Sequence, residues 1–299
     1  DGLSPLPGAD AKIRKKLASR KGSAAYWTVH MVANESFNSA EESLCYFHWR
    51  NAQYPGYIDL MPVHGQDGKV VLDYGCGPGN DVVGFSVYSD VKKLYAVDVS
   101  STALEVAKKR LELHNKTADF FLINEKENKI PLPSKSVDYI HTSGVLHHCA
   151  NLGNVLAELY RILKDNGQIA VMVYNYCSIW LHLYVAYVLK IYYGRFKDSS
   201  LLDAFRRSTD GEDCPVSRCY KPDEFLSIAQ QHGFKGRFKG AAISMTEMKC
   251  LGARFDAISD RRLSVEHRDF LSELSFSEKG IPVYQGEVAG IDACYLLEK

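Results

Sequence analysis

Two short stretches of the chain bring together the residue types that bind a nucleoside. Residues 70–79 read VVLDYGCGPG, an apolar run that ends in Asp73 and is followed by Gly75, Gly77 and Gly79. Glycines let the backbone turn sharply and approach a ligand closely. A second apolar run, residues 93–98, ends in Asp98. At the end of a strand beside a glycine turn, such a carboxylate accepts hydrogen bonds from both ribose hydroxyls, so we expect Asp98 to hold a nucleoside.

The spacing of the glycines separates two kinds of nucleotide site. A dinucleotide fingerprint places its third glycine three positions after the second, where this chain has Asn80. Here the third glycine, Gly79, follows Gly77 by two positions. The spacing therefore disfavours a nicotinamide-dependent oxidoreductase. A glycine turn without a ligand, and a helix-capping role for Asp98, are the structural alternatives.

A pair of histidines offers acid–base chemistry. His147 and His148 follow the apolar segment 137–144, and the carboxyl end of a parallel strand opens into the ligand crevice of a doubly wound sheet. A neutral imidazole there takes a proton from a hydroxyl or amine. We expect one of the two to act as a general base, with His147 preferred. The alternative is that one or both only pack, or cap the helix that opens near Asn151.

The elements that position these residues alternate between strands and helices. A helix is expected from the serines at 100–101 to about residue 115, and the apolar residues of 152–163 recur at helical spacing, with Gly167 ending that second helix. The expected strands are 70–74, 93–98, 118–124, 137–144, 168–174, 234–244 and 288–297. Strands that alternate with helices predict a doubly wound α/β sheet.

Residues 68–175 resemble the class I S-adenosylmethionine (SAM) methyltransferases, in particular small-molecule enzymes of the ubiquinone-biosynthesis type. The glycine motif carries this resemblance together with IPLPSKSVDYI, SGVLHH and ELYRILKDNGQIAVMVY. Looser similarity covers 215–245 and 288–299. The resemblance implies a Rossmann-like, doubly wound, seven-stranded and mostly parallel sheet with an antiparallel last strand and an added helical cap.

The resemblance also implies the cofactor and its residues. The cofactor would be SAM, the product S-adenosylhomocysteine, and no metal is expected. Arg50 is a candidate partner for the SAM carboxylate, because guanidinium binds a carboxylate through two parallel hydrogen bonds; a surface arginine is the alternative. Asn124 or Glu125 stands where the family often has an aspartate that pairs with adenine. The remaining cofactor candidates are Asp73, Gly75, Gly77, Gly79, Asp98, Val99 and Ser143.

The expected reaction is direct displacement of the methyl group toward a hydroxyl of a small molecule, such as a sugar, glycoside or other natural product. An amine or thiol acceptor stays open as an alternative, as does a non-catalytic SAM-binding partner subunit. Trp180, Arg218 and Tyr220 are the acceptor-side candidates. Trp180 lies in the apolar segment 178–193, and Arg218 and Tyr220 belong to the loop 206–220, which either binds a polar or anionic acceptor or is only an ordered connection.

We expect four parts in the chain. Residues 1–65, rich in aromatic side chains, would form an N-terminal helical cap. Residues 66–175 would form the SAM-binding core, 176–221 a lid insertion, and 222–299 the rest of the core with an insertion between the last two strands.

The amino-acid composition limits the kinds of partner and compartment that we expect for this protein. Lys plus Arg and Asp plus Glu both total 36, a balance that argues against a dedicated nucleic-acid binder. The eight cysteines contain no CxxC pair and are typical of free thiols in a reducing compartment, so we expect a cytoplasmic protein. The first residues lack a signal-peptide core, which indicates a trimmed end. The segment 178–193 is short for a transmembrane helix, and a homodimer contact through it stays open.

Overall fold

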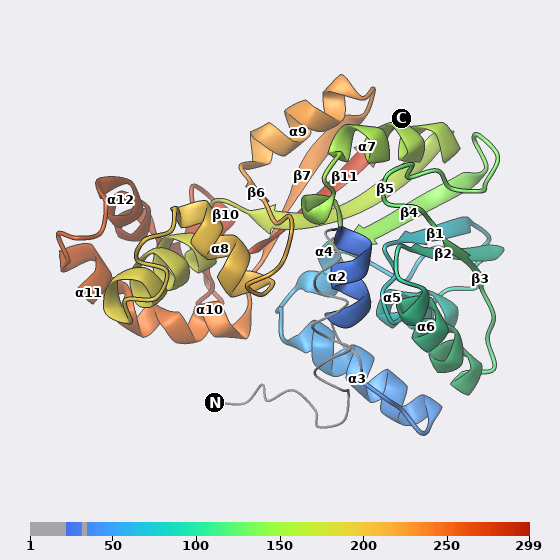
Figure 1. Cartoon of the computed structure of the whole chain (residues 1–299), viewed down its shortest axis with the longest axis horizontal. Helices are drawn as coiled ribbons and strands as arrows, with labels where there is room; N and C mark the ends of the chain where they lie inside the picture. The colour runs from blue at the N-terminus through green and yellow to red at the C-terminus, as the bar shows by residue number, and fades with distance from the viewer. Residues whose placement is uncertain (1–21, 32–34) are drawn as a thin grey trace.

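A single large sheet organises the molecule. The computed structural model describes residues 22–31 and 35–299. In spatial order the main sheet consists of β3 (Asp119–Leu122), β2 (Lys93–Asp98), β1 (Val70–Tyr74), β4 (Val137–Ser143), β5 (Leu163–Asn175), β11 (Asp292–Glu298) and β7 (Lys235–Ala242) (Figure 1). A two-residue strand, β6 (Cys219–Tyr220), pairs with the end of β5.

The strand directions confirm the predicted fold class. β1 runs parallel to β2 and β4, whereas β11 is antiparallel to both β5 and β7. Because β11 runs the other way, its first residue, Asp292, pairs with Tyr174 near the carboxyl end of β5. The antiparallel strand thus brings its amino-terminal end to the edge of the sheet where the parallel strands end.

Both faces of the sheet are covered, which explains the nearly continuous apolar runs in its strands. On one face, Leu72 and Tyr74 share a core with α7 (Leu152–Ile162) and α9 (Pro222–Gln231). On the other face, Val71 shares a core with α5 (Asn80–Tyr88) and α6 (Ser101–Leu113). Successive residues of one strand therefore serve opposite faces, as the period of two in a strand requires.

The amino-terminal helices complete the second face. These are α2 (Ser23–Val29), α3 (Ala40–Ala52) and α4 (Tyr57–Leu60). Phe47 of α3 and Tyr57 of α4 are buried in the same core as α5. A Cβ on Gly84 of α5 would lie 2.7 Å from the Phe47 ring, so the glycine permits this close helix contact. Much of the predicted cap, residues 1–21 and 32–34, lies outside the described residues, and the predicted part boundaries stay a prediction.

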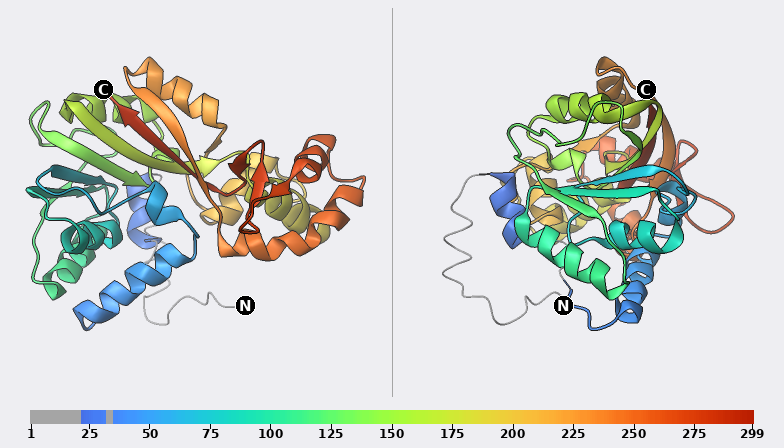
Figure 2. Two further views of the ribbon diagram at one scale, coloured as in Figure 1. Left: turned by 180° about the vertical axis from the view of Figure 1, so that it is seen from behind. Right: turned by 90° about the vertical axis from the view of Figure 1, so that its right-hand side faces the viewer.

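A second group of helices lies beyond the carboxyl end of strand β5, away from β1–β3 (Figures 1 and 2). It contains the wide π-type helix η2 (Trp180–Tyr192), α8 (Leu201–Thr209), α10 (Met245–Cys250), the short 3-10 helix η3 (Leu251–Ala253), α11 (Arg254–Ser259) and α12 (Val265–Glu273). A small sheet of β8 (Ser275–Phe276), β9 (Pro282–Tyr284) and β10 (Glu287–Val288), absent from the sequence-based expectation, accompanies them. Among the described residues, no helix combines the length and apolar character that a membrane crossing needs.

One predicted boundary is wrong. The helix expected to end at Gly167 ends at Ile162, and β5 begins at Leu163, so Gly167 lies inside the strand. Leu163 pairs with Val137, and the Lys164 Nζ lies 2.7 Å from a carboxylate oxygen of Asp138. These contacts with the start of β4 extend the strand through residues that local propensity would leave in a loop.

Candidate active site

The glycine turn after β1 is held against the end of β2. The backbone amides of Gly75 and Cys76 both donate to the carbonyl oxygen of Val97, at 2.8 and 3.0 Å. The amide of Gly77 donates to Oδ2 of Asp98 at 2.9 Å, and the amide of Ser100 donates to Oδ1 of Asp98 at 2.8 Å. The predicted turn and the predicted acid therefore lie together, with the carboxylate oriented by two backbone donors.

The three glycines have different surroundings. Their φ angles are +74° at Gly75, +50° at Gly77 and +82° at Gly79, a region that favours glycine. A Cβ would lie 2.4 Å from Val145 at Gly75 and 2.8 Å from Ala107 at Gly79, whereas at Gly77 it would meet nothing within 4 Å. Gly75 and Gly79 are thus needed by the packing, and Gly77 borders open space where a ligand could approach the backbone.

Two buried acids lie behind the turn. Burial raises the pKa of Asp98, while the amides of Ser100 and Gly77 act in the opposite direction. Burial, with the neighbouring Asp81 and Asp98, raises the pKa of Asp73 well above its usual range. The Oδ2 atom of Asp73 is buried without a hydrogen-bond partner, so this carboxyl group has capacity left for a ligand donor.

Arg50 reaches this crevice from α3. Its Nη1 lies 3.6 Å from Oδ1 of Asp81, in the first turn of α5, and its Nη2 donates to Oγ of Ser143 at 3.4 Å. Ser143, at the end of β4, also hydrogen-bonds the Tyr57 hydroxyl. Burial lowers the pKa of Arg50, but the negative charge of Asp81 outweighs this effect, so the pKa lies above its usual value. The structure thus brings two sequence candidates, Arg50 and Ser143, together beside the glycine turn.

The residues predicted to contact adenine have different surroundings. Asn124 is exposed, and its Oδ1 accepts from the amide of Lys126 at 2.9 Å. The carboxylate of Glu125 accepts from the amide of Ala24 at 2.7 Å, so it caps the start of α2, a partner that no sequence pattern predicted. Val99 follows Asp98 and is half-buried. The adenine contact stays a prediction.

The two adjacent histidines have different environments. Both ring nitrogens of His147 are buried without partners, and its ring stacks on Tyr174 at 3.7 Å between centroids. Burial, then the neighbouring His148, lowers its pKa well below the usual range. His148 instead has Nδ1 2.7 Å from the carbonyl oxygen of Val216 and Nε2 3.5 Å from Oδ1 of Asp210. Its ring also contacts Trp27 of α2, with 4.6 Å between centroids.

Four residues of this region were missing from the sequence-based set. The Tyr174 hydroxyl donates to Oδ1 of Asp210 at 2.8 Å, and the Tyr26 hydroxyl donates to the Asp210 carbonyl. Asp292 lies opposite Tyr174 in the neighbouring strand and is buried. Tyr174 could have been identified from the sequence, because it is a polar residue at the carboxyl end of a core strand. Asp292 could not, because its position depends on the order of the strands.

The predicted acceptor residues are spread over several contacts. The Trp180 indole donates to Oγ1 of Thr209 at 2.9 Å. Arg218 is exposed and donates to the carbonyl of Cys149 at 3.1 Å. Tyr220 is buried in the main core beside Phe225. The structure does not gather the three around one point, and their role in acceptor binding stays a prediction.

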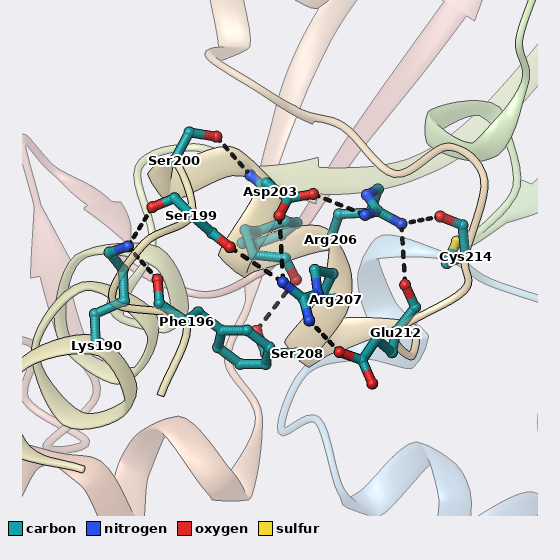
Figure 3. Close-up of polar contacts among 11 residues, drawn as sticks. Lys190, Phe196, Ser199, Ser200, Asp203, Arg206, Arg207, Ser208, Glu212 and Cys214 are labelled. Carbon is teal, nitrogen blue, oxygen red and sulfur yellow. Dashed lines mark hydrogen bonds and ion pairs between the residues drawn. The ribbon is translucent and has the colours of Figure 1, made fainter. Parts of the chain in front are cut away.

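The loop 206–220 is pinned largely by its own hydrogen bonds. Arg206 binds the carboxylate of Asp203 at 2.7 Å and donates to the carbonyls of Glu212 and Cys214, and Arg207 binds the Glu212 carboxylate (Figure 3). Arg206 and Arg207 lie in the last turn of α8, so the predicted loop begins only after Thr209, and their contacts hold its first residues in place. This arrangement agrees with the ordered-connection interpretation for Arg206 and Arg207.

Comparisons with known proteins point in one direction. Residues 72–171 match the family model described as a methyltransferase domain. The chain is 34% identical over 102 residues to a malonyl-[acyl-carrier protein] O-methyltransferase of Yersinia pestis, covering 33% of this chain and 34% of that protein. It is 36% identical over 115 residues to the protein of the same name from Pectobacterium atrosepticum, covering 38% of this chain and 41% of that protein.

A solved structure extends the likeness to most of the fold. The methyltransferase in a complex with the Haloferax volcanii Trm112 methyltransferase activator superposes with a TM-score of 0.51 at 15% identity, over 86% of this chain and 93% of that chain. This identity shows a shared fold and nothing finer. The matched region spans well under half the length of the two sequence relatives.

Proposed function

We propose that this chain, whose residues 72–171 form a methyltransferase domain of the class I SAM-dependent type, transfers a methyl group from SAM to a small-molecule acceptor. The observation that carries the proposal is the joining of the glycine turn to the Asp98 carboxylate through the Gly77 amide. Such a turn, open on the Gly77 side, allows a nucleoside to approach the backbone while the carboxylate receives its ribose hydroxyls.

The rest of the cofactor fits the same edge of the sheet. Each Asp98 oxygen already accepts one backbone hydrogen bond and retains a lone-pair site for a ribose hydroxyl. Arg50, held toward Ser143, would bind the SAM carboxylate, and the unpartnered oxygen of Asp73 would accept from its ammonium group. Val99 with Asn124 or Glu125 would border adenine.

The acceptor would lie past the ends of β4 and β5. In the transfer, the acceptor's heteroatom forms a bond to the methyl carbon as the sulfur–carbon bond breaks, S-adenosylhomocysteine leaves, and the acceptor's proton passes to a base. His147 and His148 stay the predicted candidates for that proton. Nδ1 of His148 contacts the Val216 carbonyl and Nε2 faces Asp210, whereas both ring nitrogens of His147 are buried without partners; a ring with polar partners supports His148 over His147.

We propose an oxygen acceptor, with a hydroxyl first. The two sequence relatives carry the name O-methyltransferase, which supports oxygen over nitrogen or sulfur. Because the match covers a minor part of those proteins, the acyl-carrier substrate in their names is one member of the acceptor panel and not the assigned substrate.

Two measurements test the proposal. Calorimetric titration of the purified chain should show binding of SAM and S-adenosylhomocysteine but not of NADH. Incubation with methyl-labelled SAM and a panel of hydroxyl, carboxyl, amine and thiol acceptors should then give a labelled product by mass spectrometry. A folded chain that binds NADH and not SAM would overturn the proposal, and SAM binding without transfer to any acceptor would support the non-catalytic subunit instead.

A further inference from the structure

Three metal-ligand side chains meet at the acceptor side of the crevice. His148, Asp210 and Cys214 present one ligand atom each, and these atoms all lie within 4.8 Å of one another. His148 follows β4, whereas Asp210 and Cys214 belong to the loop after α8 and are four residues apart. The side chains of His148 and Asp210 are 8% and 5% exposed, and Cys214 is fully buried. The group is therefore enclosed and comes from two distant parts of the chain.

The hydrogen bonds around this group leave the Asp210 carboxylate short of a donor. Nδ1 of His148 lies 2.7 Å from the Val216 carbonyl oxygen, which only an Nδ1–H can satisfy. In the neutral ring, Nε2 then carries a lone pair, and this lone pair faces the Asp210 carboxylate at 3.5 Å. The second carboxylate oxygen, Oδ2, is buried without any partner. With a neutral ring, two electron-pair donors therefore face each other, and either a proton on Nε2 or a metal ion fills the position between them.

The surroundings hold each donor in place. The Tyr174 hydroxyl donates to Oδ1 of Asp210, and the Val216 carbonyl fixes the orientation of the His148 ring. Metal-binding histidines almost always donate their other ring N–H in this way, and metal-binding carboxylates are themselves hydrogen-bonded. The guanidinium of Arg206 donates to the carbonyl of Cys214, which holds the loop at that residue (Figure 3).

We propose that His148, Asp210 and Cys214 together bind one divalent transition-metal ion of the zinc class. Nitrogen, oxygen and sulfur donors in a set of three suit Zn²⁺, and three protein ligands leave a fourth position open, as in catalytic and not structural zinc sites. The Cys214 thiol, now 3.3 Å from the Val216 carbonyl, gives up its proton on ligation. The ion also fastens the 210–214 loop to the end of β4.

The role of the ion rests on the proposed function. The open position would take water or the acceptor's oxygen or sulfur, and coordination favours loss of the acceptor's proton. His148 then serves as a metal ligand and not as the base. The deprotonated acceptor attacks the methyl carbon of SAM. The displaced proton passes to solvent or buffer.

Zinc binding is measured without acceptor or turnover. The purified chain, freed of metal by dialysis against a chelator, is titrated with Zn²⁺ in competition with a fluorescent zinc indicator. We expect saturation at about one ion per chain, and Cys214→Ser should weaken binding by about 10- to 100-fold or more. Cys219→Ser is the matched control, because Cys219 lies in β6 near Cys177 and Glu224 and should leave the affinity unchanged.

Cobalt identifies the sulfur ligand. Wild-type protein and Cys219→Ser loaded with Co²⁺ should show a near-ultraviolet thiolate-to-cobalt charge-transfer band that Cys214→Ser lacks. If Cys214→Ser does not fold, Asp210→Asn takes its place in the zinc titration and should also bind zinc more weakly. The amide oxygen of Asn still accepts from Tyr174, but the negative charge is lost. Wild-type protein without stoichiometric zinc binding, or equal binding by all variants, overturns the proposal.

The two proposals fail separately. SAM affinity, measured on the metal-free chain by calorimetry, reports on the methyltransferase function. A chain that binds SAM but not zinc retains the proposed function and loses the metal site. A chain that binds zinc through Cys214 but not SAM retains the metal site and loses the function.

Discussion

The amide of Gly77 donates to Oδ2 of Asp98 across 2.9 Å, and this bond joins the turn after β1 to the end of β2. The Ser100 amide occupies a site on the other oxygen, at 2.8 Å. A carboxylate held from two sides cannot rotate freely, so its remaining lone pairs point in fixed directions. The cofactor predictions depend on this preorganised acid.

Replacing Asp98 by Ala should weaken SAM binding by about tenfold or more, because a hydrogen bond to a charged group contributes about 1.5–3 kcal/mol and two ribose contacts would be lost. Calorimetry measures the affinity. Asp119→Ala is the control, since Asp119 begins β3 and pairs with Lys93 at the amino end of β2, away from the glycine turn, and should leave binding unchanged. Wild-type affinity in folded Asp98→Ala would remove Asp98 from the site.

Gly77 and Gly79 should respond differently to an added side chain. Both have positive φ, so any side chain at either position carries a backbone strain of about 1–2 kcal/mol or more. Gly79→Ala adds a clash with Ala107 and should lower the melting temperature further. Gly77→Val projects into open space and should mainly abolish SAM binding. Thermal unfolding and calorimetry separate the two effects, and intact SAM affinity in Gly77→Val would place the ligand elsewhere.

Arg50 is tested with two ligands that differ in the amino-acid part. Arg50→Lys keeps the charge beside Asp81 but loses the planar fork. It should weaken S-adenosylhomocysteine binding by about tenfold or more, because one charged hydrogen bond is lost. Methylthioadenosine lacks the carboxylate and should bind the variant and the wild type equally. An equal loss for both ligands would assign Arg50 a structural role through Asp81 and Ser143.

On the acceptor side, Arg218→Ala should raise the acceptor's Michaelis constant and leave SAM affinity unchanged, because its exposed guanidinium is available to a polar or anionic group. Tyr220→Phe provides the contrast. Tyr220→Phe keeps the buried ring beside Phe225 and should leave the acceptor's Michaelis constant unchanged. Once an acceptor is known, steady-state kinetics decide; unchanged constants in Arg218→Ala would leave the loop as a connection only.

Asp292 should make stability depend on pH. Burial raises its pKa from 3.8 to about 7, with Arg50 acting in the opposite direction. The folded state then holds a proton more tightly than the unfolded state, so the free energy of unfolding should fall as pH rises from about 4 to about 7. Asp292→Asn removes this contribution and should be more stable than wild type above that range, by a few kcal/mol at about 1.4 kcal/mol per pKa unit. The free energy of unfolding of both proteins is measured by chemical denaturation from pH 4 to 8. The same pH dependence in both would contradict this prediction.

Much of the fold and the cofactor side was predictable because the signals are local. An apolar run must become a buried strand, three glycines at alternate positions must turn, and an acid directly after a strand must lie at its carboxyl edge. The hydrogen bond between Gly77 and Asp98 agrees with this reasoning, and the role of both residues in cofactor binding stays a prediction. The same reasoning placed the Gly167 boundary wrongly, because pairing with β4 overrides the turn preference of a single glycine.

The acceptor side was decided by tertiary structure. The antiparallel insertion of β11 between β5 and β7 places Asp292 beside Tyr174, which no local pattern encodes. Adjacent His147 and His148 point to different surroundings, and only the return of the 210–214 loop gives His148 its partners. The sequence by itself therefore determined the strands of the sheet and the glycine turn beside Asp98, since both follow from short-range periodicity and turn chemistry. The tertiary structure decided which distant side chains share the crevice, since that depends on strand order and loop path.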